Sequence, residues 1–176
     1  FPTRRSSDLY LTDFASTEAF FMEWHSSPLN PLTYLRLFTH VFGHADFSHF
    51  LANMSYILLL GPMMEEKYGS RLLAFMILVC AGVSGLANYI LFPHLAICGA
   101  SGVVFMLIVL SSITSTEKGE IPLTLLLILV IYLGQEVVDM VTVSDNISHF
   151  SHILGGACGA FFGFRFLKEN PSPLTY

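Results

Sequence analysis

Five apolar runs of roughly membrane-spanning length constrain the fold of this chain more than any other feature. They cover residues 47–64, 72–92, 98–113, 121–138 and 149–167. A helix needs about 20 mainly apolar residues to cross the hydrocarbon core of a bilayer. Inside lipid the backbone N–H and C=O groups must bond to one another, so open sheets are excluded. We therefore predict an all-α, polytopic membrane protein: a helical bundle with five transmembrane helices.

The composition agrees with a membrane protein and excludes other classes. Of the 176 residues, 53% are hydrophobic and 12% are charged, whereas soluble domains carry about 25% charged residues. The net charge is only -5 and no basic stripe is present, which argues against a nucleic-acid partner. Cys80, Cys98 and Cys158 lie in or beside apolar runs, so we interpret them as packing residues and not as a disulfide framework or metal site.

The chain divides into four segments around one membrane domain. Residues 1–9 (FPTRRSSDL) are polar, basic and unlike the rest of the chain, so we interpret them as a cloning or sequence-assembly scar. Residues 10–46 are expected to form a partial N-terminal segment and a membrane-associated loop. Residues 47–167 form the transmembrane core, and residues 168–176 form a C-terminal tail.

Basic residues gather in the loops on one side of the predicted bundle. The loops after the first and third runs and the end of the fifth carry Lys67, Arg71, Lys118, Arg165 and Lys168. The other side offers His94, Asp139 and Asp145, and its one basic residue outside the N-terminal scar is Arg36. By the positive-inside rule the first side is cytoplasmic, so the first, third and fifth runs begin at the outer face. Residues 10–25 are too polar to span a membrane, so either the N-terminus lies outside or a helix upstream of these residues has been lost, and we favour the loss.

A serine and a histidine lie at the beginning of two of these runs, each beside small residues. Ser101 lies in Gly-Ala-Ser-Gly (99–102), and His152 begins the sequence His-Ile-Leu-Gly-Gly. Polar side chains within membrane segments are costly unless they are functional. A hydroxyl that attacks and an imidazole that takes its proton are the minimum pair for nucleophilic acyl transfer. Considered alone, each of the two residues is also compatible with a packing or interfacial role.

A stripe of glycines indicates that the two residues meet. Gly155, Gly159 and Gly163 come after His152 at four-residue spacing, so they share one helix face. Such a face lets two membrane helices touch backbone to backbone. The helix that carries Ser101 has its own small residues and is the natural partner, which would bring the Ser101 hydroxyl within hydrogen-bonding reach of His152.

A third polar cluster lies near the start of the first run, in the sequence HADFSHFLAN (44–53). His49 and Asn53 are four residues apart and therefore share one helix face. Both can donate hydrogen bonds to a developing oxyanion, although a polar helix cap explains them equally well. His44 is expected to lie in the preceding loop with a structural role. Because the first, third and fifth runs start on the same side, these residues, Ser101 and His152 should line one polar cavity.

A metal site is the main chemical alternative, because the chain has seven histidines. The pairs His44/His49 and His149/His152 have spacings of five and three. No His-Glu-x-x-His motif occurs, and no acidic residue accompanies either pair within a helix. We therefore predict no metal and no cofactor.

Together these motifs resemble the rhomboid family of intramembrane serine proteases. The sequences around His44, His49 and Asn53, the segment GPMMEEKYGS (61–70), the Gly-Ala-Ser-Gly motif and the His152 helix occur in the family's order. The resemblance covers residues 34–167. It implies a six-helix core, of which the five runs would be the second to the sixth.

The resemblance also implies roles for individual residues. Ser101 would be the nucleophile and His152 its general base, without a third carboxylate member. His49, Asn53 and the Ser101 backbone N–H would form the oxyanion hole. Phe105 would pack on the imidazole at a position where many relatives have tyrosine. Supporting positions would be Gly99, Gly155, Gly159 and His44.

The function implied is endopeptidase cleavage of transmembrane segments of single-pass proteins near the outer face of the bilayer. An alternative is an inactive rhomboid-like protein that binds transmembrane segments without cutting them. A small transporter or channel is a third hypothesis, but it predicts charged residues or broken helices at mid-bilayer, which the third and fourth runs lack. The compact core favours a bacterial inner membrane, and the sequence leaves the oligomeric state open.

Overall fold

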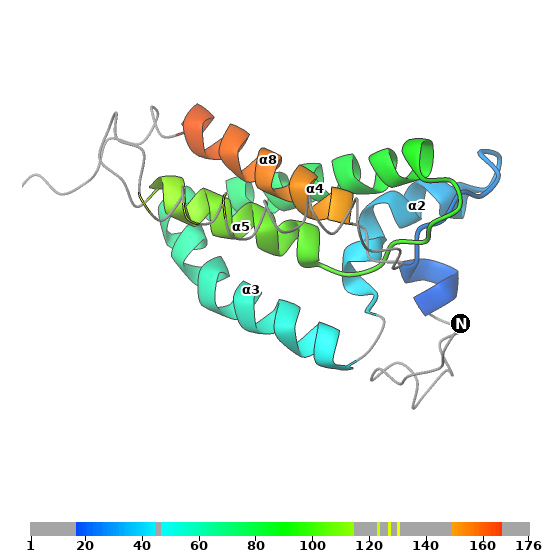
Figure 1. Cartoon of the computed structure of the whole chain (residues 1–176), viewed down its shortest axis with the longest axis horizontal. Coiled ribbons are helices and arrows are strands. Elements are labelled where there is room, and N and C mark those ends of the chain that lie inside the picture. The colour runs from blue at the N-terminus through cyan, green and yellow to red at the C-terminus, as the bar shows by residue number, and fades with distance from the viewer. Residues whose placement is uncertain are drawn as a thin grey trace, which may run out of the picture.

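The structure is a computed structural model that describes residues 17–44, 47–114 and 149–166, together with the isolated positions 123, 127 and 130. Every named element within these residues is helical, which confirms the predicted fold class (Figure 1). In chain order they are η1 (Thr17–Phe21), α2 (Pro31–Thr39), η2 (His40–Phe42), α3 (Phe47–Tyr68), α4 (Ser70–Leu91), α5 (Ser101–Thr114) and α8 (His149–Phe166). Apart from these three isolated positions, the predicted helix at 121–138 lies outside the described residues, as do the segments 1–9 and 168–176.

Four of the five predicted apolar runs coincide with α3, α4, α5 and α8. The largest difference at a helix start concerns α5, which begins at Ser101 and not at residue 98. Gly99 has a φ of 125°, a backbone conformation that L side chains rarely adopt. The chain therefore enters α5 through a short loop over residues 98–100, and Ser101 is the first helical residue. At its other end α3 runs to Tyr68, four residues past the predicted end at 64.

Helix α5 is the centre of the described structure. Its side chains are almost entirely buried: Val103, Val104, Met106, Leu107, Val109 and Leu110 are each at most 4% exposed. Four of these residues, Val103, Met106, Leu107 and Leu110, form one hydrophobic cluster with side chains from α3, α4 and α8 that include Met64, Met76 and Phe162. Figure 1 shows α8 lying along α5, with α4 beside them and α3 inclined away from α5 toward its own N-terminus. A central helix packed on several sides gives its first residue, Ser101, a fixed position.

The segment before α3 has a helix of its own that the sequence analysis did not predict. Helix α2 starts with a clear signal, since Asn30 Oδ1 accepts a hydrogen bond from the Leu32 N–H (3.0 Å) and Pro31 occupies the first turn. The guanidinium of Arg36 donates from Nε and Nη2 to the Ala19 carbonyl (2.9 and 2.7 Å) and lies 4.0 Å from the centre of the Trp24 ring. These contacts hold the segment 17–44 against itself before the chain enters α3.

One helix in the described part of the chain, Ser70–Leu91, is long and apolar enough to cross a bilayer by length and composition alone. The Ser101–Thr114 helix is apolar but shorter. Exposed side chains on α3 and α4 include many large apolar groups, among them Leu58, Leu59, Leu78 and Ile90. An outer surface of this kind suits contact with lipid.

Candidate active site

Ser101 and His152 are in direct contact. The Ser101 Oγ and the His152 Nε2 are 2.7 Å apart, a normal hydrogen-bond distance. Both side chains are half-buried. They lie on the first residue of α5 and in the first turn of α8, separated by 51 positions in sequence. The hydroxyl therefore faces a nitrogen that can accept its proton.

The glycine stripe of α8 creates this contact. A Cβ atom at Gly155 would lie 2.0 Å from the Gly102 carbonyl oxygen, and one at Gly159 would lie 2.4 Å from the Met106 carbonyl oxygen. Side chains larger than hydrogen would push α8 away from the backbone of α5. Gly155 and Gly159, four residues apart on α8, thus face Gly102 and Met106, which are four residues apart on α5. This crossing of the two helices places His152 beside Ser101.

The imidazole of His152 is held by an aromatic ring. The rings of Phe105 and His152 stack with centroids 4.7 Å apart and planes 9° from parallel. Phe105 is one turn after Ser101 on α5, so the same helix that presents the hydroxyl also supports the ring. His149, to which the sequence assigned no catalytic role, also contacts the His152 ring edge to face, with ring centroids 6.4 Å apart.

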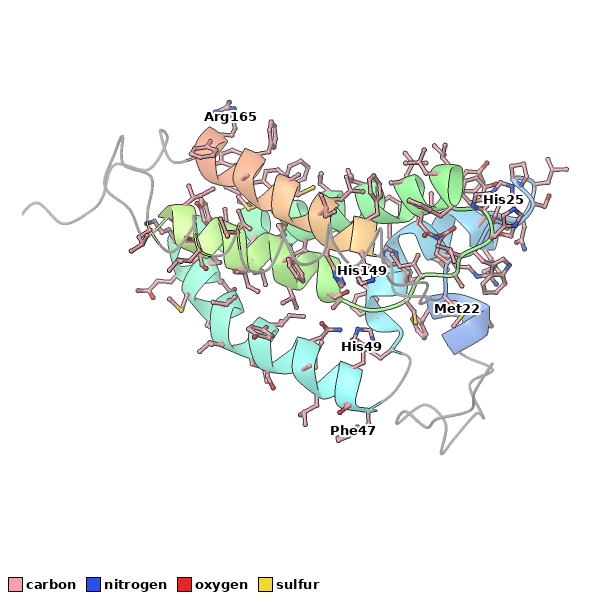
Figure 2. All side chains as sticks on the ribbon, in the orientation of Figure 1. Met22, His25, Phe47, His49, His149 and Arg165 are labelled. Carbon is pink, nitrogen blue, oxygen red and sulfur yellow. The ribbon has the colours of Figure 1, made fainter. Side chains whose placement is uncertain are left out.

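His49 and Asn53 lie against the loop that leads to Ser101. A Cβ atom at Gly99 would lie 2.6 Å from His49 Cε1 and 3.7 Å from Asn53 Nδ2. Asn53 is only 5% exposed, and its buried Nδ2 has no hydrogen-bond partner among the described residues. Figure 2 shows the His49 side chain pointing from α3 toward the place where α5 and α8 begin, whereas Phe47 points away. Both side chains thus come to the site from a third helix.

His44 supports this arrangement from the end of the preceding segment. Its ring contacts that of His49 edge to face, with centroids 5.2 Å apart, and its Nδ1 lies 3.3 Å from the Phe42 carbonyl oxygen. It is 5% exposed. The structure therefore places all nine residues singled out from the sequence around the start of α5 and its crossing with α8.

The loop before Ser101 is anchored at several points that the sequence did not reveal. The Gly99 N–H donates to the His40 carbonyl (2.9 Å), and the Val104 N–H donates to the Ala100 carbonyl (2.9 Å). Glu23 and Ile97 exchange two backbone hydrogen bonds in an antiparallel bridge. The Cys80 thiol donates to the Gly102 carbonyl (3.6 Å). Apart from the bond between Val104 and Ala100, these contacts join residues far apart in sequence, so no local sequence pattern predicts them.

Within the part of the chain that the structure describes, no group of three His, Cys, Asp or Glu side chains could hold a metal ion. The arrangement instead combines a hydroxyl, an imidazole that faces it, and a buried amide N–H donor. Such a set can perform nucleophilic attack on a carbonyl and stabilise the oxyanion that forms.

A helical bundle with a serine and a histidine in contact at the end of two helices defines a class of protein. Comparison with known families identifies that class. Residues 31–169 match the family model of the Rhomboid domain. The match covers most of the chain, so this chain belongs to the rhomboid family and is a polytopic, helical, integral membrane protein.

Individual relatives are similar over much of this chain. It is 28% identical over 165 residues to the "Rhomboid protease GlpG" of Yersinia pestis (strain Pestoides F), covering 89% of this chain and 59% of that protein. The same figures hold for the protein of that name in Yersinia pseudotuberculosis serotype O:3 (strain YPIII). The "RHOMBOID-like protein 1" of Arabidopsis thaliana is 31% identical over 140 residues, covering 75% of this chain and 34% of that protein. The chain thus spans less than two thirds of the length of these relatives.

Proposed function

We propose that this chain is an intramembrane serine endopeptidase that cleaves transmembrane segments near the outer face of the bilayer with a Ser101–His152 dyad. The observation that carries the proposal is the 2.7 Å contact between the Ser101 Oγ and the His152 Nε2. Membership in the rhomboid family and relatives named as rhomboid proteases support the same activity. The bacterial relatives favour a bacterial inner membrane.

The mechanism is set by the positions of the two side chains. His152 Nε2 takes the Ser101 proton as the Oγ attacks the carbonyl carbon of the scissile peptide bond. The oxyanion would accept hydrogen bonds from Asn53, His49 and the Ser101 backbone N–H. The first N–H groups of a helix have no acceptor within the helix, which suits Ser101 to this task. His152 then gives its proton to the leaving amine and an acyl-enzyme remains. Water, deprotonated by His152, then attacks the acyl carbon. The bond between that carbon and the Ser101 Oγ breaks, His152 returns the proton to the Oγ, and the product acid is released.

The substrate class is limited by the chemistry of helices in lipid. The carbonyls of a transmembrane helix are bonded within that helix, so attack requires local unwinding. We propose single-pass membrane proteins with small or helix-destabilising residues near the outer interface as substrates. We also propose that residues 47–167 are the transmembrane core of this protein and that residues 10–46 are the segment that precedes it.

Labelling with a fluorophosphonate probe in detergent tests the dyad, because the probe reacts covalently with an activated serine. We expect labelling of the unmodified chain and its loss in Ser101→Ala and in His152→Ala. Two matched controls are Ser111→Ala, on the same helix as Ser101, and His94→Ala, an exposed histidine. Both should label like the unmodified chain.

Asn53→Ala tests the oxyanion hole in the same assay. Loss of one such donor slows soluble serine proteases roughly 10²- to 10³-fold, so we expect much slower labelling with an unchanged fold. A folded chain that does not label at all would refute the dyad and support the alternative, a rhomboid-like protein that binds transmembrane segments without cutting them.

A further inference from the structure

A buried carboxyl group lies outside the proposed catalytic residues. Glu23 is 1% exposed, and its Oε2 accepts a hydrogen bond from the Asn88 Nδ2 (2.6 Å). Asn88, near the end of α4, is 2% exposed and also donates to the Leu95 carbonyl (3.0 Å). An acidic side chain buried to this degree is rare unless it is paired. The pair joins the segment before α2 to the end of α4.

This pair lies beside the loop that leads to Ser101. The Glu23 N–H donates to the Ile97 carbonyl (3.0 Å), and the Ile97 N–H donates back to the Glu23 carbonyl (2.9 Å). Two residues later the Gly99 N–H donates to the His40 carbonyl. Figure 1 shows this loop, in green, running past α2 toward the start of α5. Loosening of the Glu23 contacts would therefore free Ile97, which lies in the loop only four residues before Ser101.

The unsatisfied atoms of the pair indicate its protonation state. Glu23 Oε1 and Asn88 Oδ1 are buried and have no hydrogen-bond partner among the described residues. A carboxylate can only accept, so two acceptor oxygens would remain without donors. A protonated Glu23 carries an O–H that Asn88 Oδ1 can accept, and the two side chains then share two hydrogen bonds.

Burial favours the protonated form of Glu23 more strongly than the nearby charges oppose it. Arg36 on α2 and His25 in the same segment stabilise the carboxylate, as does the Asn88 hydrogen bond. Burial is the largest effect, and it raises the pKa of Glu23 above its ordinary value of 4.5. His40, whose carbonyl accepts the Gly99 N–H, is neutral at neutral pH, since burial lowers the pKa of its ring to about 4.

We propose that protonated Glu23 and Asn88 form a two-bond clamp that positions the loop before Ser101, and that the loop loosens when Glu23 loses its proton. Glu23 is thus a positioning residue and not a catalytic one. The effect on catalysis rests on the proposed function, whereas the clamp itself does not.

The sign of the pH effect is given by the direction of the shift. A group whose pKa is raised in the closed state favours closure fully below its ordinary pKa, and this contribution is lost as the pH rises through the raised pKa. The opening of the loop should therefore increase from about pH 4.5 upward. The increase is at most tenfold per pH unit, and it levels off once Glu23 ionises in the closed clamp.

Hydrogen–deuterium exchange at the Ile97 and Gly99 amides tests the clamp, measured on the full chain with the Ser101→Ala substitution. Glu23→Gln is the key variant, because glutamine keeps both hydrogen bonds to Asn88 and cannot ionise. The ratio of exchange rates, Glu23 chain over Glu23→Gln chain at equal pH, cancels the intrinsic pH dependence of exchange. We expect this ratio to rise with pH above 4.5 and the Asn88→Leu chain to exchange fast at every pH.

A Glu66→Gln chain serves as the matched control, since Glu66 is an exposed acid on α3. Its exchange ratio should stay constant with pH. A ratio for Glu23→Gln that is equally constant would overturn the clamp, whatever the stability of the Asn88→Leu chain.

Probe labelling of chains that retain Ser101 separates this proposal from the proposed function. We expect labelling of the unmodified chain to slow with rising pH relative to Glu23→Gln. A pH-dependent exchange ratio without any labelling would retain the clamp and refute the protease. Normal labelling with a constant exchange ratio would refute the clamp and retain the protease.

Discussion

At the scale of single residues, Ser101 gains its proposed reactivity from its neighbours. It is the first residue of α5, its Oγ faces His152 at 2.7 Å, and Phe105 stacks on the imidazole from one turn further along. A serine in a stretch of small residues elsewhere in a membrane helix would be a packing residue. Ser101 differs from such a packing serine because a histidine faces its hydroxyl and an aromatic ring holds that histidine in place.

Replacing Phe105 by leucine should slow probe labelling of Ser101 roughly 2- to 10-fold, because an aromatic pair contributes about 0.5–1.5 kcal/mol beyond its area. The leucine removes the ring that keeps the imidazole parallel to it. Phe105→Tyr retains the ring and should label at nearly the unmodified rate. Phe164→Leu, an exposed position on α8, is the control. An unchanged rate for Phe105→Leu would show that the stack does not orient the base.

The sequence could predict the contact between Ser101 and His152 but not the contact between Glu23 and Asn88, and the reason is physical. Ser101 and His152 are marked by small residues, and close approach of membrane helices needs small residues at fixed spacing, so the pattern carries the contact. Glu23 and Asn88 meet across 65 positions with no such pattern. An acid in a polar segment looks solvent-exposed until the fold buries it.

At the scale of elements, the crossing of α5 and α8 depends on backbone contact. Gly155 and Gly159 face the carbonyls of Gly102 and Met106, where no other side chain fits. The sequence indicates this crossing because four-residue spacing on one face is enough to identify it. Helix α2 escaped prediction since it is short and amphipathic, although Asn30 before Pro31 is a recognisable start signal.

Gly155→Ala should destabilise the fold by about 1–3 kcal/mol or more, because the added methyl group would overlap the Gly102 carbonyl and the backbones must separate. Labelling of Ser101 should fall with it, since separation lengthens the contact with His152. The matched control is Gly61→Ala on α3, where the nearest atom to an added Cβ is 4.0 Å away. There alanine should be neutral or stabilise by about 0.5–1 kcal/mol.

Thermal unfolding in detergent measures both variants. A midpoint for Gly155→Ala equal to that of Gly61→Ala would mean that α8 does not touch the backbone of α5. The comparison is internal to one chain and one substitution type, so it separates backbone contact from the general effect of replacing a helical glycine.

At the scale of the whole molecule, the site lies at one end of the helices. His49, Ser101 and His152 all belong to the first turns of their helices, whereas Lys67 and Arg165 belong to the last turns of α3 and α8. Figure 2 shows His149 and Arg165 at opposite ends of α8. The positive-inside rule assigns the basic ends to the cytoplasm, which puts the proposed site at the outer half of the bilayer.

This orientation predicts which positions a membrane-impermeant maleimide can reach on intact cells. In a chain whose three cysteines are replaced by alanine, His94→Cys should label from outside, because His94 lies in the exposed turn between α4 and α5. Glu66→Cys, near the far end of α3, should label only after the cells are permeabilised. The opposite pattern would move Ser101 to the cytoplasmic half, and substrates would then have to unwind at their cytoplasmic ends. Because the two positions lie at opposite ends of neighbouring helices, one experiment fixes the side of the membrane from which water must reach His152.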